Sequence, residues 1–276
     1  MISVKNVRTL NGDVTNYEIP SSDDRKIEAE GKLLLFPGII DPDICFGSVD
    51  SQNWKAAIQS AIKAGITTTI ELPSAILLHN TKSELEQKKI QVEEALLDLK
   101  IPLNHFEYLL YSGENLENIN QLGSEKKMVK GLALQLDYEQ DEILDEKWEH
   151  LFRLAAVDDL PVVINARNGD SKHRALKKKS KGFLEKAIEY VEKWSCRLYV
   201  LNVATQNEID LIQKARNRSL LIYAETSPQY LFPEDTSNCK HLWEALNNNV
   251  IETIGSGYNV NQQVQEKVHF NGNDYN

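Results

Sequence analysis

The chain has 276 residues, of which 41% are hydrophobic and 26% charged, and its formal net charge is −10. Its length and composition are typical of one large globular α/β domain. The acidic balance disfavours nucleic acid and anionic membranes as partners, and we expect neither. The N-terminus has no apolar signal-peptide region, and the three cysteines are too few and too scattered for a disulfide framework. We therefore expect a protein of the reducing cytoplasm.

Eight apolar, β-branched runs alternate with helical patterns. Strands are expected at Leu35–Ile44, Ile66–Leu72, Leu103–Tyr111, Val129–Leu136, Pro161–Ala166, Arg197–Val203, Ser219–Glu225 and Val250–Ser256. Helices are expected at Trp54–Ile62, at Lys82–Leu99 with Leu85, Lys89, Val92 and Leu96 on one face, and at Glu185–Trp194. Strands about 30 residues apart, each followed by a helix, predict a (β/α)8 TIM-type barrel, with an open doubly wound sheet as the alternative.

The two ends of the chain differ from this pattern. Residues 1–35 predict a small N-terminal β segment with a turn at Asn11 and Gly12, and residues 36–276 predict the barrel. The stretch Tyr258–Asn276 is polar, with room for two helical turns at Gln262–Val268, so we expect a barrel truncated after its eighth strand. A missing eighth helix leaves an apolar flank, which predicts a homo-oligomer or a protein partner at residues 2–10 or 250–270.

Several ordered segments carry a family resemblance. They are the run Leu34–Pro42, the pieces Ala64–Thr68 and Glu71–Pro73, the stretch Glu225–Pro228 and the tripeptide Ile254–Ser256. In this order and spacing they resemble the dihydroorotases, within the cyclic amidohydrolase superfamily. The resemblance covers residues 27–267 and implies a barrel that hydrolyses cyclic amides with metal-bound water.

The resemblance also implies where the two metal ions of that family would be held. The matching ligand positions in this chain are Asp43, Cys45, Ala133, Asn165, Asn202 and Gly257. Alanine and glycine offer no side-chain donor, and neutral amides are poor zinc ligands. We therefore predict that the zinc of the family is lost, that no cofactor is bound and that no catalytic residue remains there. Asn165 and Asn202 are expected to point inward and to be hydrogen-bonded.

Other residues offer alternative sites. Glu71 and Glu225 lie near strand ends and could form a general acid/base pair, although a structural carboxylate is the alternative for Glu225. Cys45 is interpreted as a buried inert thiol rather than a reactive one. His79 is interpreted as a solvated loop residue, and His105 as a core or surface histidine rather than a metal ligand.

These observations lead to three functional hypotheses. The first is a dihydroorotase-like pseudoenzyme that serves as a scaffold or regulatory subunit; the resemblance implies aspartate carbamoyltransferase of pyrimidine biosynthesis as its partner. The second is a divergent hydrolase or lyase that acts on a C–N bond with a rebuilt or metal-independent site. The third is a small-molecule sensor. The basic run Lys172–Lys181 either binds an anion or forms a solvated loop.

Overall fold

A computed structural model describes residues 1–49, 51–72, 82–111, 127–134, 145–166, 177–232 and 239–259. Its contacts divide the chain into two compact units, Met1–Ile39 and Ile40–Asn276. The sequence-based division lay between residues 35 and 36. None of the helices in the described ranges combines the length and the apolar character that a membrane crossing requires.

The first unit is a three-stranded sheet in the order β2-β1-β3. Strands β1 (Ile2–Arg8) and β2 (Val14–Ile19) form an antiparallel hairpin, and β3 (Arg25–Glu28) pairs with β1 in parallel. Gly12 lies in the hairpin turn with φ of 89°, a conformation that favours glycine. The β segment expected at the N-terminus is thus confirmed.

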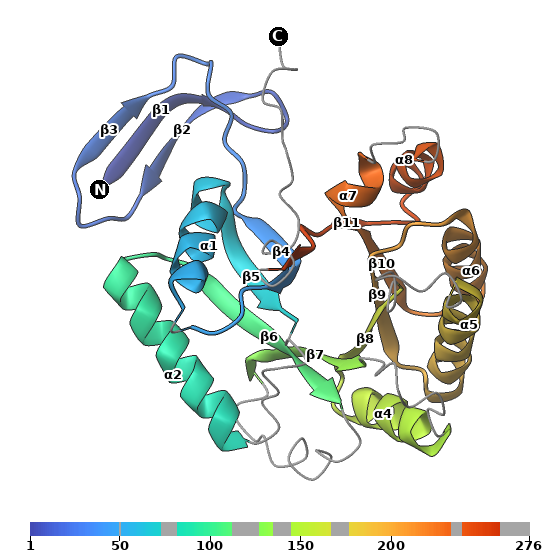
Figure 1. Cartoon of the computed structure of the whole chain (residues 1–276). Coiled ribbons are helices and arrows are strands. Elements are labelled where there is room, and N and C mark those ends of the chain that lie inside the picture. The colour runs from blue at the N-terminus through green and yellow to red at the C-terminus, as the bar shows by residue number, and fades with distance from the viewer. Residues whose placement is uncertain are drawn as a thin grey trace. The chain divides into compact units, whose positions relative to one another are not determined.

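The second unit contains a parallel sheet in the order β11-β10-β9-β8-β7-β6-β5-β4-β12 (Figure 1). Its strands are β4 (Ile39–Cys45), β5 (Ile66–Glu71), β6 (Asn104–Tyr111), β7 (Val129–Leu134), β8 (Pro161–Asn165), β9 (Arg197–Leu201), β10 (Ile222–Thr226), β11 (Thr253–Ile254) and β12 (Tyr258–Asn259). Strand β11 pairs with β10 and β12 pairs with β4, and only Gly255–Gly257 separate them. The two short strands therefore form the eighth barrel strand and close the sheet.

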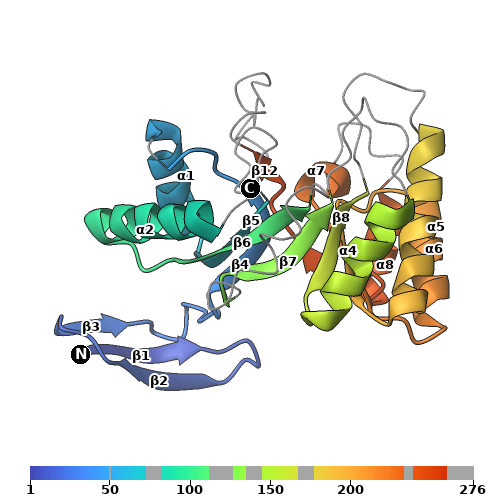
Figure 2. The ribbon, with the colours of Figure 1, turned by 90° about the horizontal axis from the view of Figure 1, so that it is seen from below.

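Helices cover the outside of this barrel. They are α1 (Gln52–Lys63), α2 (Lys82–Leu99), α4 (Asp145–Val157), α5 (Lys177–Trp194), α6 (Gln206–Arg216), α7 (Pro228–Leu231) and α8 (Lys240–Asn247). Helices α4, α5 and α6 lie side by side against the strands (Figure 2). Local sequence sets where two of them begin: Ser51 caps α1, and Thr205 with Glu208 forms a capping box at α6.

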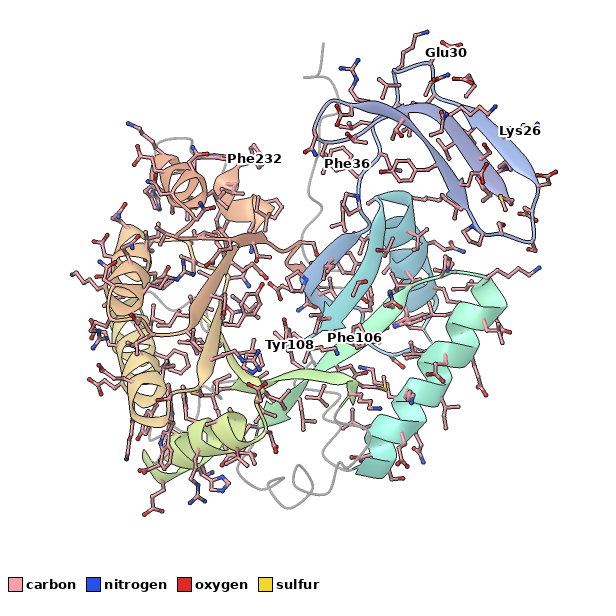
Figure 3. The ribbon with its side chains drawn as sticks, turned by 180° about the vertical axis from the view of Figure 1, so that it is seen from behind. Lys26, Glu30, Phe36, Phe106, Tyr108 and Phe232 are labelled. Atoms are coloured by element: carbon pink, nitrogen blue, oxygen red, sulfur yellow. The ribbon has the colours of Figure 1, made fainter. Side chains whose placement is uncertain are left out.

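Alternation along each strand separates the barrel interior from the helix-covered face. Tyr108, Leu110, Ala133, Val163 and Leu201 form a cluster drawn from strands alone, and Figure 3 shows Tyr108 within the ring of strands. Neighbouring strand residues instead pack with helix residues in two larger clusters. This division decides which polar side chains can meet.

The (β/α) barrel predicted from the sequence is confirmed, and the closed sheet excludes the open doubly wound alternative. Strand ends shift by a few residues; the run predicted at Ser219–Glu225, for example, forms β10 at Ile222–Thr226. The predicted face of α2 is wrong at one position, because the helix buries Lys88 rather than Lys89. The predicted helical turns at Gln262–Val268 lie outside the described residues.

Candidate functional site

A buried polar cluster lies inside the barrel, where the carboxyl ends of β4, β9 and β10 meet. The side-chain amide of Asn202 donates a hydrogen bond to Oδ2 of Asp43 at 2.8 Å, and the Ser227 hydroxyl donates to Oδ1 of Asn202 at 3.0 Å. Asp41 lies two residues before Asp43, and its Oδ1 accepts the backbone N–H of Ser256 at 3.0 Å. Asp41 and Asp43 lie within β4, and Asn202, Ser227 and Ser256 follow the ends of β9, β10 and β11, where barrel enzymes place their chemistry.

Glu225 joins the cluster from β10. Its carboxyl group has no exposed surface, hydrogen-bonds with Asp43, and accepts a hydrogen bond from the Tyr199 hydroxyl at Oε2 over 2.6 Å. A Cβ on Gly255 would lie 2.5 Å from Oε1 of Glu225, so the glycine leaves the space that this carboxyl group fills. Glycine at this position is therefore a packing requirement of the interior site.

The acids of this cluster have unusual proton affinities. Burial, reinforced by the Asp43 charge, raises the pKa of Glu225 well above its usual range. Burial also raises the pKa of Asp43 to about 6, and raises the pKa of Asp41. The hydrogen bond between Glu225 and Asp43 lowers the pKa of Asp43 and raises that of Glu225. The interaction thus favours the proton on Glu225 and the negative charge on Asp43.

The structure brings some of the matched metal positions together. Asp43 and Asn202 are in direct contact, and a Cβ on Gly257 would lie 3.8 Å from Oδ1 of Asn202. Ala133 belongs to the interior cluster, and Asn165 ends β8 on the same strand face as the interior residue Val163. The matched positions therefore point to one region inside the barrel. Asn202 points inward and is hydrogen-bonded, as expected.

These residues do not fit a binuclear zinc centre. Of Asp43, Asn202, Ala133 and Gly257, only Asp43 can supply a charged ligand, and its carboxylate already accepts the Asn202 amide. Burial raises the pKa of the Cys45 thiol to about 11, which disfavours the thiolate that zinc requires. Cys45 is buried, which agrees with the interpretation of an inert thiol.

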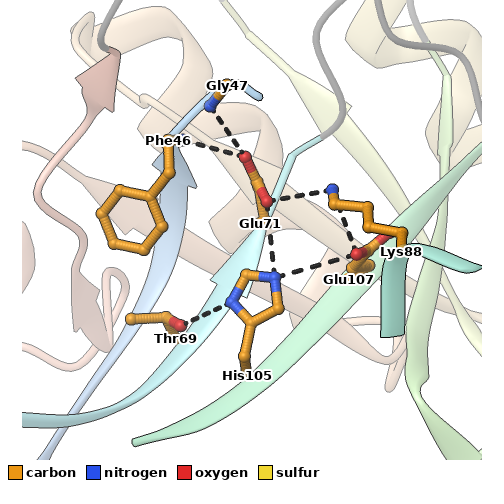
Figure 4. A network of polar contacts seen from close by, with 7 residues as sticks. All are labelled: Phe46, Gly47, Thr69, Glu71, Lys88, His105 and Glu107. Carbon is orange, nitrogen blue, oxygen red and sulfur yellow. Dashed lines mark hydrogen bonds and ion pairs between the residues drawn. The ribbon is translucent and has the colours of Figure 1, made fainter. Parts of the chain in front are cut away.

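Glu71 does not join this interior cluster, so the expected pair with Glu225 is not formed. Alternation on β5 places Ile70 in the interior cluster and turns Glu71 toward helix α2. There its Oε1 accepts the backbone N–H groups of Phe46 and Gly47 at 2.8 and 3.2 Å (Figure 4). Glu71 and Glu225 thus lie on opposite faces of the sheet, which is a correction to the acid/base hypothesis.

Four charged side chains form a network on this helix-covered face. Nζ of Lys88 lies 3.0 Å from both Glu71 and Glu107, and Nε2 of His105 lies 3.4 Å from Glu71 and 3.7 Å from Glu107 (Figure 4). Neither Lys88 nor Glu107 was singled out from the sequence. Cross-strand pairing of Glu71 with Glu107 is the signal that predicts their contact once the register is known.

Charge pairing governs this outer network. Burial would raise the pKa of Glu71, but Lys88 and His105 outweigh burial and hold it at about 2. Burial would likewise lower the pKa of Lys88, yet the two carboxylates raise it to about 12. Ligand atoms of Glu71, His105 and Glu107 all lie within 4.8 Å of one another, which is close enough to hold a metal ion. The expectation of a protein without any metal therefore stays a prediction.

Other expected residues lie outside the described parts of the chain. His79 and residues 172–176 of the basic run are among them, and of the rest of that run the structure gives only the start of α5. The interpretations of His79 as a solvated residue and of Lys172–Lys181 as an anion site stay predictions.

Known proteins resemble this chain in sequence and in fold. It is 24% identical over 303 residues to an L-hydantoinase of Paenarthrobacter aurescens, covering 91% of this chain and 62% of that protein. It is 20% identical over 252 residues to a dihydroorotase of Methanosphaera stadtmanae, covering 82% and 55%. These relatives indicate the cyclic amidohydrolase superfamily. No protein-family model matches it.

The solved structure of an L-hydantoinase from Arthrobacter aurescens shares the fold of this chain, with a TM-score of 0.72 at 20% identity over 93% of this chain and 68% of that one. The chain spans between half and two thirds of the length of the curated relatives that it matches. The likeness to this superfamily rests on the barrel and on the ordered sequence matches along it.

Proposed function

We propose that this chain is a dihydroorotase-like protein without a binuclear metal centre, and that it acts as a scaffold or regulatory subunit. The observation that carries the proposal is the hydrogen-bonded chain from Asp43 through Asn202 to Ser227. Asp43 and Asn202 stand at positions where the family resemblance would place metal ligands, and they bind each other. A carboxylate that already accepts an amide, beside an alanine and a glycine, provides too few donors for zinc.

The experiment for this proposal measures metal content and turnover in the same preparation. We expect well under one zinc per chain, and no hydrolysis of dihydroorotate or hydantoin above a buffer control, with or without added zinc. Stoichiometric zinc that disappears in Asp43→Ala, together with zinc-dependent hydrolysis, would contradict the proposal. The Glu189→Gln variant is a suitable control, because Glu189 is exposed on α5.

A partner belongs to the same proposal. The resemblance to dihydroorotases suggests aspartate carbamoyltransferase, and hence a role in pyrimidine biosynthesis. Co-purification of the two proteins from the native cell, with a defined ratio in light scattering, would support this role. If a different stable partner co-purifies, the scaffold role would still be supported, but the proposed role in pyrimidine biosynthesis would be contradicted.

The pair of Asp43 and Glu225 favours a second candidate, a metal-independent hydrolase or lyase acting on a C–N bond. The two hydrogen-bonded acids have pKa values displaced in a way that suits a general base beside a general acid. Turnover that survives a chelator but is lost in both Asp43→Asn and Glu225→Gln would establish this candidate. Equal turnover in wild type and both variants would reject it.

A further inference from the structure

The buried network between the barrel and α2 resembles a metal site more closely than the barrel interior does. It lies on the helix-covered face of β5 and β6, where Glu71 and Glu107 are paired across neighbouring strands. His105 lies two residues before Glu107 on β6 and points to the same side. One imidazole and two carboxylates are a ligand set that zinc accepts.

The geometry of the three ligands suits a small ion. Nε2 of His105 lies 3.4 Å from Oε2 of Glu71 and 3.7 Å from Oε1 of Glu107. With metal–ligand bonds of about 2.1 Å, the edges of a tetrahedral zinc site are about 3.4 Å long. The two separations from Nε2 of His105 are near that length, and all three ligand atoms lie within 4.8 Å of one another.

The orientation of His105 suits a metal ligand. Its side chain is buried, and its Nε2 faces the carboxylates of Glu71 and Glu107. The other ring nitrogen, Nδ1, lies 3.0 Å from the hydroxyl of Thr69. A hydrogen bond to one ring nitrogen orients the other toward a metal in many metal sites.

We propose that Glu71, His105 and Glu107 form a site for a divalent metal ion of the zinc class, and that the ammonium group of Lys88 occupies the place of that ion. Lys88 reaches from α2 and touches both carboxylates at 3.0 Å. A metal ion and an ammonium group would repel each other here, so binding requires Lys88 to leave. The site is distinct from the barrel interior, because it lies on the other face of the sheet.

Zinc titration of wild type, Lys88→Ala, Lys88→Gln and the double variant Lys88→Ala/His105→Ala tests the proposal. Removal of the buried ammonium should increase zinc affinity about 100-fold or more, since a like charge next to the metal is lost. Zinc should raise the Tm of the single variants, and cobalt in its place should give a visible absorption spectrum. The double variant should show neither effect.

Three outcomes would overturn the proposal. One is equal zinc affinity in wild type and the Lys88 variants, and another is affinity that does not depend on His105. The third is failure of both Lys88 variants to fold even in the presence of zinc, because the metal would then not replace the ammonium group. If the wild-type protein binds zinc, and this binding is lost in Asp43→Asn but kept in His105→Ala, the proposed function is contradicted. The outer site would then still be judged by the zinc affinity of the Lys88 variants.

Discussion

Asn202 and Asp43, 159 residues apart in sequence, are joined by a hydrogen bond of 2.8 Å inside the barrel. Asn202 adopts φ of 59°, a left-handed conformation that asparagine tolerates better than most residues. A histidine at this position would have to find a metal or another partner. The asparagine instead forms hydrogen bonds with Asp43 and Ser227, so the polar side chains of the site bind one another.

Removing the Asn202 side chain should destabilise the protein. Asn202→Gly keeps the left-handed backbone but leaves the buried Asp43 carboxylate without its amide donor. We expect the free energy of unfolding to fall by about 1–3 kcal/mol in urea denaturation. Asn249→Gly is the matched control, because Asn249 is exposed and has a similar φ of 54°. Equal effects of the two changes would show that the Asn202 hydrogen bond contributes nothing.

Asp43 should make stability depend on pH between about 4 and 6. Its pKa is raised from 3.8 to about 6 in the folded protein, so folding favours the protonated acid. The stability that the protonated Asp43 side chain contributes to the folded protein is therefore complete below pH 4 and is lost as the pH rises through 6. Relative to Asp43→Asn, wild type should lose up to about 3 kcal/mol between these limits. Parallel pH profiles of unfolding free energy for the two proteins would contradict the shift.

Gly255→Ala should force the Glu225 carboxyl group out of its place. The added methyl group would lie 2.5 Å from Oε1 of a buried side chain, and we expect a loss of about 1–3 kcal/mol. In the background of Glu225→Ala the same change should cost much less, which a double-mutant cycle measures. Gly182→Ala on α5 is the control, since nothing lies within 4 Å of its added group. An equal cost of Gly255→Ala in both backgrounds would refute the packing argument.

The protein should not act as a bare monomer. Ile40 on β4 and Ile254 on β11 are 59% and 48% exposed. Apolar side chains exposed on a barrel flank favour a covering partner. We expect light scattering at micromolar concentration to show a dimer or larger assembly, and Ile254→Lys to weaken it. A monomer at high concentration, with no partner recovered from the native cell, would contradict this expectation.

Much of this architecture could be predicted because strand and helix periods are local properties of sequence. The eight barrel strands were expected, with ends wrong by a few residues, as at Ser219–Glu225. Side-chain partners were harder to predict because they depend on register and face. Because successive residues of a strand point to opposite faces, Glu71 faces α2 while Glu225 faces the barrel interior. The same alternation on β6 brings His105 and Glu107 under α2. Burial of Lys88 instead of Lys89 follows from two carboxylates that no helix pattern reveals.

The most direct test of the central claim is the metal content and zinc-dependent turnover of the purified wild-type protein. We expect well under one zinc per chain, and no hydrolysis of dihydroorotate or hydantoin when zinc is added. One or more zinc ions bound through Asp43, with hydrolysis that Asp43→Ala abolishes, would contradict it.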